Sequence, residues 1–272
     1  MEKESFCNKN CDLAISIPLL LVNQIFGESL SCEINNRYED MRNNFNLNYA
    51  EWQDCFTTKG KPYNKYENDN DNTTSICISA KETRFPELQE FNRIGLDLPT
   101  WNNVGNIKNT IMFVAQDPLR SEYYNDCHDI IVSSPFGTHD ATHRKSRHGE
   151  VYFDIFSKIV EKGYGIYLTD TKKFYIKGNN STSYTKKQTQ IYEEILKKEI
   201  EIVNPKIIVA FGKHAQFSVI KVDGEKRLLH LIHPSGAARG HIKKKYDLDD
   251  CSNKIIAETY IKDILDTLSN IK

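Results

Sequence analysis

The second half of the chain contains four short, mostly apolar runs, at residues 111–115, 166–169, 207–211 and 228–232. Their apolar residues follow one another without regular alternation, which is typical of strands that are buried on both faces of a sheet. Pro118 comes shortly after the first run and ends any further sheet pairing there. We therefore predict four parallel strands at the centre of a domain.

Segments with the apolar spacing of helices lie between and after these strands. The pattern predicts helices near residues 151–162 and 189–203, a short helix at 213–220 and a last helix at 254–271. Strands that alternate with helices are typical of a parallel sheet covered by helices. The predicted fold is α/β, a three-layer αβα sandwich with a central four-stranded parallel sheet.

Residues 1–107 do not follow this alternation. Helices are expected at 13–26, at 49–56 and at 85–92, and a polar loop is expected at 59–74. We predict a mainly helical N-terminal extension of unknown role, with the α/β domain beginning after it.

The net charge limits how the protein could bind nucleic acid. The 272 residues carry a formal net charge of −1, so the molecule as a whole is no polycation. Any contact with nucleic acid must therefore come from local basic segments. The apolar run at 13–26 is interrupted by polar residues and is too short to span a bilayer. The first residues also lack the charge pattern of a signal peptide.

The cysteines argue against a disulfide framework. There are seven, their spacings are irregular and no CxxC pair occurs, so a regular zinc site is not expected either. Cys7 and Cys11 have the spacing of half a metal site, but no second half matches them. We expect a reduced, cytoplasmic protein that binds no metal.

Residues able to do chemistry follow each predicted strand. In order along the chain these are Gln116 and Asp117, Thr169 and Asp170, Gly212 and Lys213, and His233 with Pro234, Ser235 and Gly236. Because the carboxyl ends of parallel strands meet at one edge of a sheet, these residues should converge. Taken singly, Asp117 and Asp170 could each cap a helix, and His233 could be a hydrogen-bonded core histidine. Their convergence favours a functional site.

Five segments together resemble the uracil-DNA glycosylase superfamily. In chain order they read AQDPLR, SSPFG, GIYLTDTKKF, IVAFGKHA and HPSGAARG, beginning at residues 115, 133, 165, 208 and 233. The first is similar to the water-activating motif, whose commonest form is GQDPYH, and the last to the motif that begins HPS. The resemblance covers residues 108–272 and identifies the chain as a divergent member, with the N-terminal extension outside it.

The resemblance implies a DNA glycosylase, a hydrolase that flips a base and breaks its N-glycosidic bond to leave an abasic site. Asp117 would position water beside the charge that develops on the sugar, and His233 would donate to the departing base. Phe136 would stack on the base. The remaining pocket residues implied by the resemblance are Gln116, Leu119, Asp170 and Ser235. This scheme needs no cofactor.

Two departures from the common motifs bear on the substrate. Asp170 stands where the family usually has Asn, and an ionised Asp only accepts hydrogen bonds. It would suit the amino group of cytosine and repel the O4 of uracil. Leu119 replaces a Tyr that crowds the C5 position. Together they suggest a C5-modified cytosine of phage DNA, and hence a role in antiviral defence.

Other interpretations remain open. A protonated Asp170 would mimic Asn, which would leave uracil removal in DNA repair as the function. A protein that keeps the fold but only binds DNA is a further alternative. A nucleotide-binding α/β protein is disfavoured, because no P-loop or GxGxxG motif follows a strand.

Basic residues near the predicted site are candidates for DNA contacts. They are Arg144, Lys145 and Arg147, Lys172 and Lys173, and Arg239. Arg239 is also the candidate for filling the gap left by the flipped base. The alternative for many of them is an ordinary solvated surface. The expected partner is duplex or single-stranded DNA, with neither a membrane nor an obligate protein partner.

Overall fold

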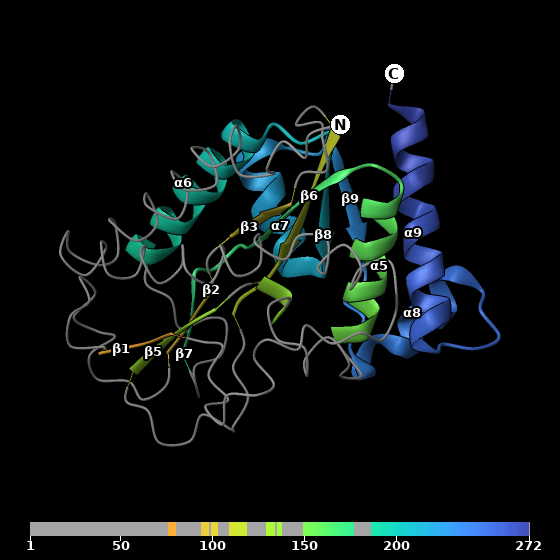
Figure 1. The fold of residues 1–272 in the computed structure, drawn as a ribbon, viewed down its shortest axis with the longest axis horizontal. Helices are drawn as coiled ribbons and strands as arrows, with labels where there is room; N and C mark the ends of the chain where they lie inside the picture. Colours follow the sequence, from red (N-terminus) through yellow and green to blue (C-terminus); the bar gives the residue numbers. More distant parts are fainter. Residues whose placement is uncertain are drawn as a thin grey trace, which may run out of the picture.

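The computed structural model describes part of the chain. The residues described are 76–79, 94–97, 99–102, 109–118, 129–133, 135–137, 149–176 and 186–271. Of these, all the helices of eight or more residues come after residue 148. They surround a main sheet, and a smaller sheet lies beside it (Figure 1).

The main sheet has five strands in the order β3-β6-β4-β8-β9. Their bounds are Thr100–Asn102 for β3, Gly165–Asp170 for β6, Thr110–Ala115 for β4, Ile207–Phe211 for β8 and Leu228–Leu231 for β9. The last four are parallel neighbours, which confirms the predicted four-stranded parallel sheet. The fifth strand, β3, pairs antiparallel with β6 at the edge and was not predicted.

Helices cover both faces of the main sheet, as predicted (Figure 1). On one face lie α5 (Gly149–Glu161), α8 (Arg239–Tyr246) and α9 (Asn253–Asn270). On the other lie α6 (Lys186–Val203) and α7 (Lys213–Asp223). The three-layer αβα sandwich is therefore confirmed. The eight-residue α8 was not predicted, and Ile242 is its one buried residue.

The apolar runs are buried because each strand contributes side chains to both faces. In β4, Ile111 and Phe113 pack towards α5 and α9, whereas Met112 and Val114 pack towards α6 and α7. All four side chains are fully buried. The continuous apolar pattern of β4 thus follows from its central position.

A second sheet joins strands from both sides of residue 108. Its order is β1-β5-β2-β7, with bounds Ile76–Ser79, Asp129–Ser133, Ile94–Asp97 and Phe174–Ile176 respectively. The described segments before residue 108 are therefore strands, not helices. The helices expected at 13–26, 49–56 and 85–92, and the loop at 59–74, lie outside the described residues. The boundary at residue 107 remains a prediction.

Among the described helices, none combines the length and the apolar character needed to cross a bilayer.

Candidate active site

The parallel sheet brings the chemistry-bearing residues to one edge, as the sequence pattern predicted. Ala115 is the register partner of Asp170, and Phe211 is the register partner of Leu231. Gln116 and Asp117 therefore leave β4 beside the end of β6, and His233 follows β9 beside the end of β8. The residues that follow β8 and β9 lie close together, because a Cβ placed on Gly212 would be 3.5 Å from the Cβ of His233.

Asp117 is partly buried next to groups of both charges. Burial raises the pKa of its carboxyl above the ordinary value, and the charge of Asp97 raises it further. Opposing these, the side chain of Gln116 donates to Oδ2 at 2.8 Å. The charges of Lys172 and His214 also lower the pKa of Asp117. A carboxylate that is held in this way suits a base that orients water.

Asp97, Lys172 and His214 complete the surroundings of Asp117. Asp97 ends strand β2 of the second sheet and is 4% exposed. Burial lowers the pKa of Lys172, and the charge of Asp117 opposes that shift. Sequence reasoning missed Asp97, because nothing in the irregular region before residue 108 links it to the strand ends. His214 lies in the segment IVAFGKHA, whose pattern predicts no role for it.

His233 contacts a tyrosine that the sequence pattern did not single out. Its Nε2 lies 2.9 Å from the hydroxyl oxygen of Tyr152 on α5, and the two rings are 5.9 Å apart. Burial raises the pKa of Tyr152 well above its ordinary value, so the hydroxyl keeps its proton. A protonated hydroxyl can donate to a bare Nε2 or accept from its N–H, so the contact suits either tautomer.

Phe136 lies in an aromatic cluster that includes Tyr152, the residue whose hydroxyl contacts His233. It occupies the 3₁₀ turn η5 (Pro135–Gly137) with a left-handed φ of 59°. Its ring centroid is 4.9 Å from that of Tyr152, 5.1 Å from Phe156 and 5.8 Å from Phe211. These contacts hold a flat apolar ring, partly buried, near the edge where His233 lies.

Asp170 and Ser235 are the remaining described pocket residues. Asp170 ends β6 and is 2% exposed, and its negative charge contributes to the raised pKa of Tyr152. Asp170 thus acts electrostatically on Tyr152, whose hydroxyl contacts His233. Ser235 is partly buried and precedes the short turn η6 (Gly236–Ala238). Leu119 lies outside the described residues.

One of the predicted DNA contacts is wrong. Lys173 is fully buried, and its amino group binds Glu199 at 2.9 Å, so it cannot reach a phosphate. The prediction failed because a lysine ordinarily points to solvent. The guanidinium of Arg239 donates to the backbone oxygen of Cys251 and to Oδ1 of Asn253, and the residue is partly buried. These contacts do not test its predicted role in DNA binding, which stays a prediction.

The other predicted DNA contacts stay predictions. Lys172 is partly buried beside Asp117. Arg144, Lys145 and Arg147 lie outside the described residues. Lys213 and His214, at the end of β8, are exposed at the same edge of the sheet.

The part of the chain that the structure describes contains no group of three or more His, Cys, Asp or Glu side chains placed to hold a metal ion.

Comparison with known families agrees with this geometry. The sequence model of the Uracil DNA glycosylase superfamily matches residues 103–256, which include every strand of the main sheet except β3. A comparison with curated proteins returned no match. The match covers more than half of the chain and contains the whole candidate site apart from Asp97. The chain therefore belongs to the uracil-DNA glycosylase superfamily.

Proposed function

We propose that this protein is a DNA glycosylase that removes a C5-modified cytosine, with Asp117 and His233 as its catalytic residues. Membership of the superfamily implies a DNA glycosylase, that is, a hydrolase of N-glycosidic bonds. One observation carries the assignment of residues: a partly buried carboxylate, Asp117, stands at the same sheet edge as His233 and Asp170.

The proposed reaction uses charges that develop at two places. As the glycosidic bond lengthens, positive charge grows on the sugar, and ionised Asp117 would stabilise it and orient the attacking water. Negative charge grows on the base, and an N–H of His233 would donate to the base carbonyl. The hydroxyl of Tyr152, 2.9 Å from His233 Nε2, supports this by limiting the orientations of the imidazole.

The substrate assignment rests on Asp170. An ionised carboxylate offers only acceptors, which fits the exocyclic amino group of cytosine and opposes the O4 of uracil. The main-chain oxygen of Asp170 is bound by Lys173, so the strand end that carries the carboxylate is held in place. Leu119, in place of a bulkier Tyr, supports a pocket that admits a substituent at C5. Because such bases mark viral DNA, we propose a role in defence against phages.

Uracil is a second candidate, favoured by the burial of Asp170. At 2% exposure, an ionised carboxylate costs free energy unless it is compensated. A neutral carboxyl group would carry one donor and one acceptor and would then read uracil as an amide does.

Excision assays on defined oligonucleotides separate these candidates. The strands carry uracil, cytosine, 5-hydroxymethylcytosine or its glucosylated form, and alkali converts abasic sites into strand breaks. We expect breaks at a modified cytosine and none at uracil. Breaks at uracil alone would overturn the cytosine assignment, and binding of DNA without any breaks would favour a binding module.

The variant Asp170→Asn tests the base reader in the same assay. Replacing an acceptor-only group by an amide should move the preference towards uracil, by about 10-fold or more, since one bidentate base contact contributes about 1–3 kcal/mol of discrimination. An unchanged preference would remove Asp170 from that role.

A further inference from the structure

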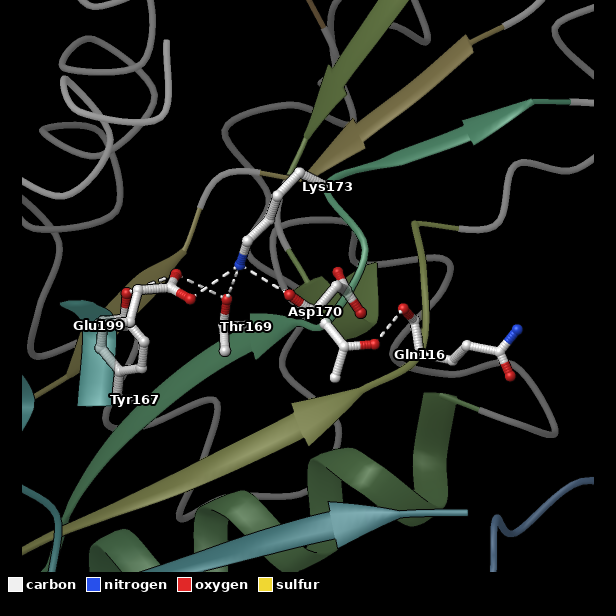
Figure 2. A network of polar contacts seen from close by, with 7 residues as sticks. Gln116, Tyr167, Thr169, Asp170, Lys173 and Glu199 are labelled. Carbon is white, nitrogen blue, oxygen red and sulfur yellow. Dashed lines mark hydrogen bonds and ion pairs between the residues drawn. The ribbon is translucent and has the colours of Figure 1, made fainter. Parts of the chain in front are cut away.

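Lys173 and Glu199 form a buried ion pair behind the candidate site. The amino group of Lys173 lies 2.9 Å from Oε2 of Glu199, and both side chains are shielded from solvent, with 0% and 1% exposure. Glu199 comes from α6 and Lys173 from the segment that follows β6. Figure 2 shows the lysine reaching down between the glutamate and the end of β6.

Every polar group of this pair has partners. The three hydrogens of the Lys173 ammonium go to Glu199, to Oγ1 of Thr169 at 2.7 Å and to the backbone oxygen of Asp170 at 2.6 Å. The second oxygen of Glu199 accepts from Thr169 at 2.8 Å and from the hydroxyl of Tyr167 at 3.0 Å. A fully satisfied network of this kind holds one geometry.

The ion pair is connected to the main chain near Asp170 and, through the residues next to Lys173, to the main chain just before Asp117. On one side, Lys173 binds the main chain of Asp170 directly. On the other, Thr171 and Lys172 donate their backbone N–H groups to the oxygens of Ala115 and Gln116, each at 2.9 Å. The hydroxyl of Thr171 also donates to the oxygen of Gln116 at 2.9 Å. Residues 170–173, here called the reading loop, therefore bridge β6 to the residue before Asp117.

Stability alone does not account for such a pair. Taking two charges out of water costs several kcal/mol for each ion, and apolar residues of similar volume often give equal or greater stability. Apolar residues, however, could not bind the inward-facing oxygen of Asp170. The buried pair therefore fits a role in holding the main chain of Asp170 in place.

We propose that Lys173 and Glu199 are positioning residues that fix the reading loop, and through it the placement of Asp170 relative to Asp117. The roles of Asp170 and Asp117 in this proposal rest on the proposed function. Loss of the pair should leave DNA binding largely intact and slow base excision, because displacement by about 1 Å at a reacting centre can cost about 100-fold in rate.

Three variants distinguish a positioning role of the buried pair from a contribution to protein stability alone. Lys173→Met and Glu199→Gln each leave a buried partner uncompensated, so both should lower the melting temperature and the single-turnover rate of excision. The double variant Lys173→Met/Glu199→Leu removes both charges. It should recover most of the melting temperature but keep an excision rate at least about 10-fold below wild type, with KM for the DNA little changed.

A surface ion pair provides the matched control. Lys221 binds Glu193 at 2.6 Å and also joins α6 to a neighbouring element, but its side chain is 63% exposed. Lys221→Met should leave the excision rate unchanged. Recovery of the wild-type rate along with stability in the double variant would reduce the buried pair to a structural role and overturn the proposal.

Amide hydrogen exchange gives a readout that does not depend on activity. In the double variant, the amides of Thr171 and Lys172 should exchange faster, by about 10-fold if each loses about 1.4 kcal/mol of protection. Amides in β8 should be unaffected. A wild-type protein without excision activity would count against the proposed function alone, whereas unchanged exchange at Thr171 and Lys172 would count against the positioning proposal.

Discussion

Asp117 is the residue whose environment is best defined by the structure. Burial and the charge of Asp97 favour its neutral form, whereas Gln116, Lys172 and His214 favour its ionised form. The net result is a pKa above the ordinary value for aspartate. The surroundings of this side chain therefore raise the pH at which its carboxyl group ionises.

Removal of the Asp117 charge should lower the excision activity without lowering the stability of the protein. Asp117→Asn should lower the single-turnover rate by at least about 100-fold, as expected for loss of a positioned base. Because the folded state raises the pKa of Asp117, the ionised form disfavours folding at pH values above that pKa. The melting temperature of Asp117→Asn at pH 8 should therefore equal or exceed that of the wild type, and full activity in this variant would exclude the role of Asp117.

The pH profile of excision should follow the neighbours of Asp117. Activity needs the ionised carboxylate, so the rate should rise with pH through the raised pKa of Asp117. Lys172→Met removes a charge that lowers this pKa and should move the rise to higher pH. Asp97→Asn removes a charge that raises it and should move the rise to lower pH. Rates at saturating DNA measure both shifts, and shifts in the same direction would contradict this account.

Tyr152→Phe tests the contact with His233. The ring can keep its packing on Phe136, but the 2.9 Å contact with Nε2 is lost. We expect a rate about five- to tenfold lower, since one hydrogen bond contributes about 1 kcal/mol net. Tyr246→Phe is the control, because its hydroxyl binds Asp263 instead of a residue of the site. Equal effects of the two variants on the rate would argue against Tyr152.

At the residue scale, sequence reasoning succeeded where a residue follows a strand. Asp117, Asp170 and His233 could be placed together because parallel strand ends share an edge. Lys173 could not be placed, because its buried partner Glu199 is 26 residues away and lies on a helix. Tyr152 shows the same limit, since its contact with His233 spans 81 residues.

At the scale of secondary structure, the turn between β8 and α7 carries a strict backbone requirement. Gly212 has a φ of 84° and a ψ of 164°, a conformation that is essentially restricted to glycine and costs other residues about 1–3 kcal/mol. The Cβ of an alanine there would meet the Cβ of His233 at 3.5 Å, an ordinary contact, so strain and not collision should dominate.

Gly212→Ala should therefore destabilise the protein by about 1–3 kcal/mol. The excision rate of the folded variant should fall only if the turn carries strain into the neighbouring strand end. Urea unfolding measures the first effect and single-turnover assays the second. Gly224→Ala, which also has a positive φ but lies at the far end of α7, is the control for strain away from the site.

The elements of the main domain were largely predictable because their apolar patterns are long. The strand predicted at 207–211 has those bounds, and the helix predicted at 189–203 begins three residues earlier, at Lys186. The strands β1, β2, β3, β5 and β7 were missed, because their three to five residues carry little pattern and their pairing partners are distant in the chain.

At the scale of the molecule, the two sheets connect the region before residue 108 with the rest. A chain that begins at residue 108 lacks β1, β2 and β3, and so leaves β6 without its edge partner and β5 without either neighbour. We expect this truncation to be less stable and less soluble than one that begins at residue 76, which keeps all the described strands. Thermal unfolding and soluble yield compare the two, and equal behaviour would support the boundary at residue 107.

The position of Asp97 separates one influence on Asp117 from the segment shared with the superfamily. Asp97 acts on Asp117 from the second sheet, yet it precedes the shared segment, which begins at residue 103. A substitution at Asp97 would therefore change the acidity of Asp117 from outside that segment. A chimera that transplants only residues 103–256 would lack this contribution to the pKa of Asp117.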